Sequence, residues 1–476
     1  VDLLCTNYNK DEKITDLLKN YTFYIIPKIS PDGSDVYLHS DQRLRSVNRN
    51  YPLSELADGL HPGDIDGDGA IRMMRVKTPY GAWKVSEKDP QVMTKRTPFD
   101  VQGDFYNIYP EGEIINYDGL HIELAKEKWG LDFNRNYPFG WFSEVRQPGA
   151  GKYPLSNPEN KAVADFVLAH PNIGFVSTLH TTGGVLVYPP GTYPEAKALK
   201  KDMDLFKKVG KMAKQIMGYE TVNIFDGFLT DIENYSSGAF DDWCYETQGI
   251  PAYTIELWNL FERAGADMSW PRKDKDDDVQ EAEYAMVLKW IKENIGESAI
   301  KPWTAFDHPR LGPVEIGGFD YKFIHQNPPC DYLLQEVEKT AKFMLANAYA
   351  LPKLKFESVK TEKICDGIYK LEAVLGNTGY MPTYLTDSAK RQKIDQPVHI
   401  ALSGCEVIEG EAVLMVNALE GVSGVNTYYG YDGITTQKHS PQLKQFTWII
   451  SGKQNDLVTL TATSQKAGKA SIQCVL

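Results

Sequence analysis

Two side chains in apolar surroundings are suited to hydrolytic chemistry. His180 ends an apolar run and is followed by Thr-Thr-Gly-Gly. Such a histidine can ligate a metal, although a structural histidine fits the same pattern. Glu256 lies inside the apolar run 253–258, where a buried carboxylate is costly unless it is paired, neutralised or close to a metal. A strand-end glutamate that faces solvent is the alternative interpretation.

The segment 131–138 combines several polar groups in a small space. It reads Leu-Asp-Phe-Asn-Arg-Asn-Tyr-Pro and places a carboxylate, a guanidinium and two amides within five positions. The fork of Arg135, beside the amide of Asn134, is well shaped to hold a carboxylate at two points. A surface turn with solvated side chains is the competing interpretation.

Composition limits the class of protein that presents these groups. The 476 residues include 51 basic and 64 acidic side chains, for a net charge of −13, which argues against a nucleic-acid partner. At about 100–200 residues per domain, two or three domains are expected. No run reaches about 18 apolar residues, so no membrane span is expected. The six cysteines are widely spaced and leave the cellular compartment undecided.

The groups must be positioned by an α/β region. Residues 1–296 alternate short apolar runs with amphipathic stretches, which predicts a mostly parallel mixed sheet flanked by helices. Strands are predicted at residues 21–28, 175–179, 185–188 and 253–257. Helices are predicted after residues 156–159, over residues 205–216 and over residues 284–295.

From residue 351 onward the pattern changes to short alternating strands separated by turns, which predicts an all-β sandwich. We therefore expect an α/β domain at 1–300, a connecting segment with a helix at 301–350 and the sandwich at 351–476. Within the first domain, residues 50–130 are rich in Gly, Pro and Asp. They are predicted to form a long irregular insertion, either functional or stabilised by an ion.

These motifs, in this order, resemble the zinc metallocarboxypeptidase family that includes carboxypeptidases A and B. The resemblance covers residues 17–296. Within the family, the sequence is most similar to large bacterial members with an Asp-Gly-Asp-Gly insertion and a C-terminal β domain. The matching segments are IIPKISPDG at 25–33, RLRSVNRN at 43–50, GLDFNRNYP at 130–138, STLHTTGGVLVYPPGT at 177–192 and SGAFDDWCYETQGIPAYTIELW at 237–258.

The resemblance implies catalytic roles for three residues. His180 matches the third zinc ligand, and Glu256 matches the general base that takes a proton from zinc-bound water as this water attacks the scissile carbonyl. Arg45 matches the arginine that polarises the carbonyl and stabilises the oxyanion, with Arg43 and Arg49 as alternatives.

The resemblance also implies a substrate-binding set. Asn134 and Arg135 match the clamp for the substrate's terminal carboxylate, and Asp132 matches the carboxylate that orients a ligating histidine. Asp241 matches the pocket-floor position that is acidic in members cleaving basic C-terminal residues, which implies Lys or Arg substrates. An Asp241–Asp242 helix cap is the alternative interpretation.

The chain departs from the family pattern at the metal. The family supplies two zinc ligands from a His-x-x-Glu motif ahead of the strand that matches residues 21–28. None of the nine histidines here is followed by Glu at the third position, and His61 lies within the insertion. We expect the motif to precede residue 1, and a genuine loss of the metal is the alternative. Because catalytic zinc needs three protein ligands, we predict that this chain binds zinc weakly or not at all.

A second departure concerns the family's substrate-capping tyrosine. The matching position holds Asn234, and Tyr235 follows one residue later. Tyr235 is therefore a candidate for the capping role, and a tyrosine packed within the loop is the alternative.

The insertion contains a sequence typical of half an EF-hand calcium loop. Asp64, Asp66 and Asp68 occupy loop positions one, three and five, and glycine occupies position six. Position twelve is arginine rather than glutamate, so another residue must complete a calcium site, with Asp100 and Asp104 as candidates. A plain Asp-Gly turn is the alternative.

The combined hypothesis is a secreted zinc metallocarboxypeptidase, extracellular or periplasmic, that acts on peptide or protein C-termini. Two rivals remain. One is a non-catalytic peptide- or glycan-binding protein that keeps the carboxylate clamp without a metal. The other is an amidase acting on peptidoglycan stem peptides. The sequence predicts no oligomeric state.

Overall fold

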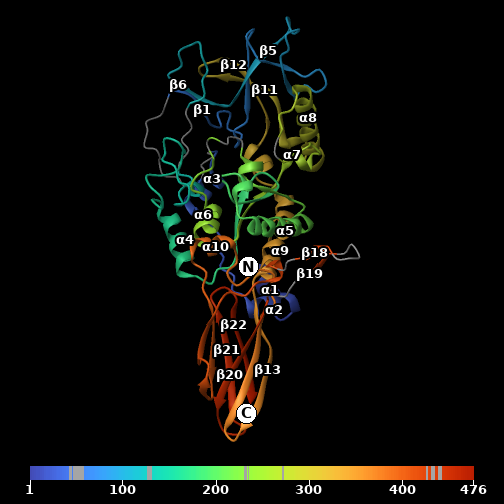
Figure 1. Ribbon diagram of the computed structural model, residues 1–476. Coiled ribbons are helices and arrows are strands. Elements are labelled where there is room, and N and C mark those ends of the chain that lie inside the picture. The colour runs from blue at the N-terminus through green and yellow to red at the C-terminus, as the bar shows by residue number, and fades with distance from the viewer. Residues whose placement is uncertain are drawn as a thin grey trace.

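The protein is built from three parts arranged in a row (Figure 1). A six-stranded antiparallel sheet lies at one end, a mixed sheet with helices lies in the middle, and two four-stranded sheets lie at the other end, where the chain terminates. The computed structural model describes residues 1–41, 46, 58–125, 131–229, 233, 235–270, 273–424, 427–429, 435–437 and 442–476.

The middle part is organised around a mixed sheet in the order β7-β10-β8-β9. The central strand β10 pairs parallel with β7 and antiparallel with β8, and β8 pairs parallel with β9. This arrangement confirms the predicted mostly parallel sheet. The strands are β7 (Val176–Thr181), β8 (Val185–Tyr188), β9 (Glu220–Asn223) and β10 (Ala252–Leu257).

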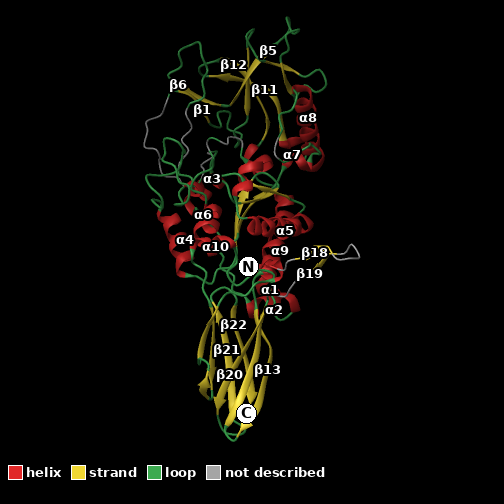
Figure 2. Cartoon of the chain, in the orientation of Figure 1, coloured by secondary structure: helices red, strands yellow, loops and turns green. Residues whose placement is uncertain are grey.

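Helices pack on both faces of this sheet, as Figure 2 shows in red. Tyr253 and Ile255 of β10 share an apolar cluster with Phe206 of α5 and Phe343 of α9. Because side chains alternate along a strand, Thr254 and Glu256 face the opposite side. None of the described helices is both long and apolar enough to cross a membrane. The helices of this part are α4 (Pro158–Ala169), α5 (Lys200–Met217), α6 (Phe240–Gln248), α7 (Leu260–Arg263), α8 (Asp277–Asn294) and α9 (Cys330–Ala346).

The predicted strand at residues 21–28 is wrong. Three helices surround this stretch, but it forms no strand, and Ile25 and Ile26 are half exposed. Tyr24 anchors it by packing edge-on against Phe166 of α4, with ring centroids 5.3 Å apart. An apolar β-branched run becomes a strand only where a neighbouring strand pairs with its backbone. The N-terminal helices are α1 (Asp2–Asn7), α2 (Glu12–Asn20) and α3 (Pro31–His39).

The predicted irregular insertion contains strands and shares a sheet with the predicted connecting segment. The sheet order is β11-β12-β2-β5-β3-β4, so two strands from near residue 310 join four strands of the insertion. A smaller β1–β6 pair packs against this sheet, because Leu60 of β1 and Ile114 of β6 share an apolar cluster with Met74 of β2. These strands are β1 (Gly59–Pro62), β2 (Met73–Lys77), β3 (Trp83–Val85), β4 (Met93–Lys95), β5 (Phe105–Pro110), β6 (Gly112–Ile115), β11 (Ile300–His308) and β12 (Gly312–Phe319).

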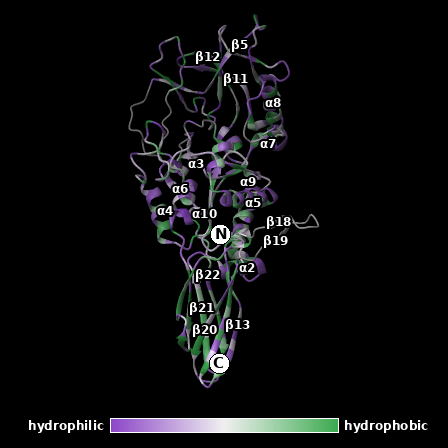
Figure 3. Ribbon diagram, viewed as in Figure 1, coloured by the Kyte–Doolittle hydropathy of each residue, from purple (hydrophilic) through white to green (hydrophobic). Residues whose placement is uncertain are grey.

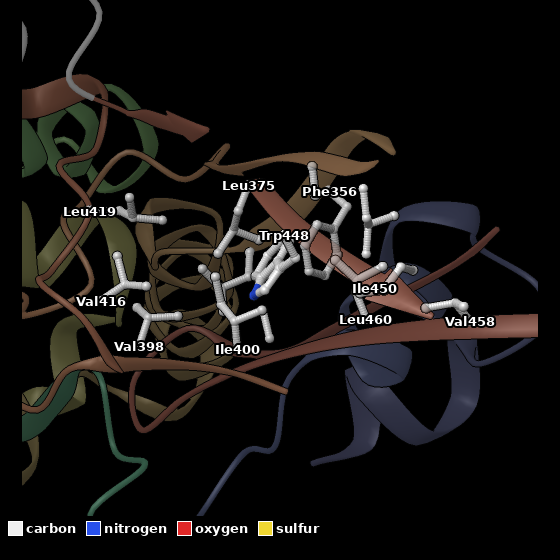
Figure 4. Packing of buried hydrophobic residues seen from close by; sticks show 14 of the residues in the cluster. Phe356, Leu375, Val398, Ile400, Val416, Leu419, Trp448, Ile450, Val458 and Leu460 are labelled. Carbon is white, nitrogen blue, oxygen red and sulfur yellow. The ribbon is translucent and has the colours of Figure 1, made fainter. Parts of the chain in front are cut away.

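The C-terminal strands form the predicted sandwich. The sheets β13-β14-β20-β16 and β17-β15-β21-β22 enclose a core centred on Trp448 (Figure 4), and apolar stretches run along their strands (Figure 3). A β18–β19 hairpin stands apart from both sheets. The strands are β13 (Leu354–Cys365), β14 (Ile368–Asn377), β15 (Val398–Ser403), β16 (Glu406–Glu409), β17 (Val413–Val416), β18 (Thr427–Tyr429), β19 (Thr435–Gln437), β20 (Leu443–Ser451), β21 (Leu457–Ser464) and β22 (Gly468–Val475).

Polar contacts attach the sandwich region to the middle part. Asp202 of α5 accepts the backbone N–H groups of Asp387 and Ser388, the first residues of α10 (Asp387–Gln392), at 2.7 and 3.0 Å. Lys466 donates to the carbonyl of Ile173 at 2.8 Å. Since unpaired helix N-terminal N–H groups are costly, the carboxylate of Asp202 stabilises α10 where it meets α5.

Candidate active site

His180 and Glu256 lie side by side on neighbouring strands. They are direct partners in the parallel register of β7 and β10. Nδ1 of His180 lies 3.9 Å from Oε1 of Glu256, with the histidine half-buried and the glutamate buried. The pairing of the two strands therefore places an imidazole and a carboxylate together at the ends of β7 and β10.

The turn after β7 is fixed directly behind Glu256. Thr182 Oγ1 and the N–H of Gly183 both donate to the carbonyl of Trp258, and the side-chain amide of Asn259 donates to the carbonyl of Gly183. A Cβ atom on Gly183 would lie only 3.1 Å from the Cβ of Glu256. This close approach leaves Glu256 little room to shift away from its position beside His180.

The predicted clamp sits on a short helical turn. Asp132 accepts the N–H of Asn134 at 2.9 Å and so begins the 3-10 turn Phe133–Arg135. The carbonyl of Asn134 accepts a bond from Arg135 at 2.7 Å, and Arg135 also donates to Ser236 Oγ at 3.2 Å. The guanidinium is thereby held in one orientation. Asp132 is buried at the start of this turn, where it shapes the clamp.

A second connection joins the clamp to helix α6. Oδ1 of Asn134 accepts the N–H of Phe240, the first residue of α6, at 2.9 Å. Gly238 has a φ of +64°, and a Cβ atom there would lie 2.5 Å from the carbonyl oxygen of Arg135. The two segments, about 100 residues apart in sequence, can approach this closely only because residue 238 is glycine.

Helix α6 brings two buried carboxylates to the site. Asp241 accepts hydrogen bonds from Thr254 Oγ1 at 2.7 Å and from the N–H of Asp242 at 2.9 Å. Asp242 accepts the N–H of Gly191 at 2.9 Å, and its Oδ2 atom is buried without a hydrogen-bond partner. Burial raises the pKa of both aspartates, and the positive charge of Arg135 opposes that rise.

The helix-cap interpretation of Asp241 and Asp242 does not match the start of α6. Ala239, and neither Asp241 nor Asp242, occupies the N-cap position of α6. Asp241 reaches β10 through Thr254, which lies two residues before Glu256 and on the same face of the strand. Asp241 thereby connects α6 to the face of β10 that carries Glu256.

Tyr235 is packed into its loop. Its ring centroid lies 4.5 Å from that of Phe142 and 5.9 Å from the guanidinium of Arg146. Burial raises the pKa of its hydroxyl. These contacts match the packed-loop alternative stated from the sequence, and Asn234 lies outside the described residues.

Arg45, with its alternatives Arg43 and Arg49, lies outside the described residues. Asp64, Asp66 and Asp68 do not enter this cluster, because they lie between β1 and β2, next to the six-stranded sheet.

The described residues do not fit a catalytic zinc ion. Such an ion takes three protein ligands and keeps one open position. Within the described ranges, the only three His, Cys, Asp or Glu side chains with ligand atoms gathered within 4.8 Å are Asp64, Asp66 and Glu111. His180 is not among these three residues, although it lies beside the carboxylate of Glu256. The described part of the chain therefore brings no three candidate zinc ligands together at His180.

Sequence reasoning missed two residues of this site, Thr254 and Ser236, and it considered Asp242 only as part of a helix cap. The alternation of a strand could have identified Thr254, because it puts this residue on the same face as Glu256. Ser236 carries no comparable signal, since its partner Arg135 is far away in the sequence. The contact of Asp242 with Gly191 is likewise distant in the sequence.

Comparisons with known proteins agree with this geometry. Residues 1–265 match the family model of the zinc carboxypeptidases, and residues 353–475 match a domain of unknown function. Carboxypeptidase A1 of Mus musculus is 32% identical in an alignment of 139 residues that covers 27% of this chain and 32% of that protein. Carboxypeptidase O of Bos taurus is 31% identical in an alignment of 176 residues that covers 32% of this chain and 45% of that protein.

Among solved structures, the crystal structure of thrombin activatable fibrinolysis inhibitor is 18% identical, with a TM-score of 0.30. The match covers 61% of this chain and 56% of that one. The chain spans about a third of the length of the carboxypeptidase A1 sequences that it matches. The family model covers more than half of the chain, so this protein belongs to the zinc carboxypeptidase family.

Proposed function

We propose that this protein is a metallocarboxypeptidase that acts outside the cytoplasm and removes C-terminal residues, with a preference for Lys or Arg. A continuous set of contacts around one site carries the proposal. Arg135 contacts Ser236, Asn134 contacts Phe240, and Asp241 contacts Thr254, two positions from Glu256 on β10. In this proposal the carboxylate clamp, the acidic side chain of Asp241 and the proton acceptor Glu256 act on one peptide terminus.

Each group has a distinct task in this proposal. Arg135 and the amide of Asn134 bind the terminal carboxylate, which explains action at the chain end. Asp241 is buried and its pKa is raised, so a cationic substrate side chain is favoured because it compensates the buried charge. The carboxylate of Glu256 accepts a proton at Oε1, next to Nδ1 of His180.

Binding measurements on the full chain test the recognition half of the proposal. We expect isothermal titration to show hippuryl-Arg binding about tenfold more tightly than hippuryl-Phe, equivalent to about 1.4 kcal/mol. The amide of hippuryl-Arg, which lacks the terminal carboxylate, should bind at least about tenfold more weakly than the acid. Tighter binding of hippuryl-Phe would contradict the basic preference.

A matched pair of variants assigns the carboxylate clamp to one residue. Arg135→Gln should abolish discrimination between hippuryl-Arg and its amide, because the guanidinium is the group that pairs with the carboxylate. Arg310→Gln, at an exposed position in the turn between β11 and β12, should bind both ligands as the unmodified protein does. Equal discrimination in the two variants would remove Arg135 from the clamp.

One observation favours a second candidate function, which is peptide binding without catalysis. The described residues provide a single histidine for zinc while keeping the clamp and the acidic pocket. Hydrolysis of hippuryl-Arg in zinc-containing buffer would support the peptidase. Tight binding of hippuryl-Arg without release of arginine would support the binding protein instead.

A further inference from the structure

Three carboxylates converge next to the six-stranded sheet, away from the groups discussed so far. Asp64 and Asp66 lie in the loop between β1 and β2, and Glu111 lies between β5 and β6. Each offers an oxygen, and these oxygens all lie within 4.8 Å of one another. Forty-seven positions separate Asp64 from Glu111. The pairing of β2 with β5 and of β1 with β6 brings them together.

Two of these carboxylates are largely buried, and one of them has an oxygen without a hydrogen-bond partner. Asp66 has a side chain that is only 10% exposed, and its Oδ1 atom has no hydrogen-bond partner while its other oxygen pairs with Lys301. Glu111 is fully buried and accepts backbone N–H groups of Arg72 at 2.5 Å and Ile65 at 3.3 Å. Burial and the neighbouring aspartates raise the pKa of Glu111 to about 7.

Acidic side chains outnumber the described cationic side chains at this place. Lys301 pairs with Asp66 and Asp68, and Arg72 pairs with Asp68 at 2.7 Å. Among the described residues, these two cations lie beside the acids Asp64, Asp66, Asp68 and Glu111, and Asp41 adds a further acid by accepting the N–H of Asp64. A divalent cation brings positive charge to this acidic group and gives the free Asp66 oxygen a partner.

We propose that Asp64, Asp66 and Glu111 hold one hard divalent cation of the calcium class. Oxygen ligands are those that calcium prefers, and its flexible coordination allows water and backbone carbonyls to complete the shell. Glu111 takes the part that the glutamate at position twelve plays in an EF-hand loop. Asp68, at position five, instead turns toward Arg72 and Lys301.

The residues suggested by sequence for completing the site are engaged elsewhere. Asp100 pairs with Lys84 at 2.6 Å, and Asp104 pairs with Lys77 at 2.8 Å. A plain Asp-Gly turn accounts for Asp64, whose carboxylate accepts the N–H groups of Gly67 and Gly69. That interpretation leaves the free oxygen of Asp66 and the buried charge of Glu111 unexplained.

Calcium titration of the full chain tests the proposal. After treatment with EDTA and dialysis, CaCl₂ should bind with saturation at one site in isothermal titration, and MgCl₂ should bind more weakly because magnesium demands stricter octahedral geometry. The absence of saturable calcium binding overturns the proposal. Magnesium binding as tight as calcium overturns the assignment to the calcium class.

Matched variants locate the ion. Glu111→Gln removes the charge and keeps an acceptor oxygen for the N–H of Arg72, although it loses the acceptor for the N–H of Ile65, and it should weaken calcium binding by at least about tenfold. Asp66→Asn should do the same and serves as the test if the first variant fails to fold. Asp104→Asn removes an exposed acid of the insertion and should bind calcium as the unmodified chain does. Unchanged affinity in a folded Asp66→Asn protein overturns the site.

Discussion

The sandwich core and the proposed pocket floor, Asp241 and Asp242, are buried equally deeply but are built from opposite chemistry. Trp448 is 1% exposed among apolar side chains of both sheets (Figure 4), and Asp241 and Asp242 are 2% and 1% exposed. Burial of the indole ring stabilises the fold, whereas burial of adjacent carboxylates costs several kcal/mol before any partner is counted. Equal depth of burial therefore has opposite energetic consequences in the two regions, because the buried groups differ in chemical type.

The largest effect is expected in the sandwich. Trp448→Ala should lower the free energy of unfolding of this part by about 3–5 kcal/mol, because it removes a large buried ring and its bond to the carbonyl of Glu411. Affinity for hippuryl-Arg should change by less than about twofold. Differential scanning calorimetry measures the loss of stability, and isothermal titration measures the affinity for hippuryl-Arg.

The control for this substitution is Trp448→Phe, which retains an aromatic ring in the core and should cost clearly less stability. If a folded Trp448→Ala protein lost hippuryl-Arg binding, the contrast between the two regions would fail, because the sandwich would then contribute to the pocket.

A smaller effect of opposite sign is expected at the pocket floor. Asp241→Asn should raise the free energy of unfolding at pH 7 by about 1 kcal/mol, because it removes one of two adjacent buried carboxylates. It should also weaken hippuryl-Arg binding by about tenfold. Asp204→Asn, an exposed change on α5, should alter neither quantity.

The pH dependence of Asp241→Asn gives an independent readout. Since the pKa of Asp241 is raised above 3.8 in the folded state, the folded protein keeps a proton that the unfolded chain has lost. This contribution is present at low pH and disappears as pH rises through the folded pKa. Chemical denaturation between pH 4 and 8, as an approximate range, should therefore show a flatter profile for the variant. An unchanged profile would mean that Asp241 does not titrate in this range.

The smallest effect is expected for metal content. After dialysis, elemental analysis should find well below one equivalent of zinc in the 476-residue chain, and His180→Ala should leave that value unchanged, because one histidine does not hold zinc tightly. A full equivalent in the unmodified protein that disappears in His180→Ala would refute this expectation.

The local sequence pattern was sufficient to predict secondary structure where neighbouring residues decide it. The runs that became β8 and β10 are short, apolar and buried, and the strands after residue 351 alternate as a sandwich requires. The run at residues 21–28 has the same composition but no strand partner, and pattern alone does not reveal whether a partner exists. Composition therefore identifies a possible strand, and pairing decides whether it forms.

The functional residues show the same difference between local pattern and long-range pairing. The resemblance to the family located Asn134, Arg135, His180 and Glu256, which the structure brings into one region. Glu111 was not found, because its relation to Asp64 exists only after β-strand pairing. Groups that depend on pairing between distant segments carry no local signal.

The six-stranded sheet also has a consequence for synthesis of the chain. Arg75 of β2 is bonded to Glu315 of β12 across 240 residues of sequence. At about 5–20 residues per second, the ribosome makes β12 about 10–50 s after β2. Until then the edge of β2 that β12 will cover is open to other chains. The order of translation therefore leaves this edge of β2 unpaired while the intervening residues, which include the whole β7-β10-β8-β9 sheet, are made.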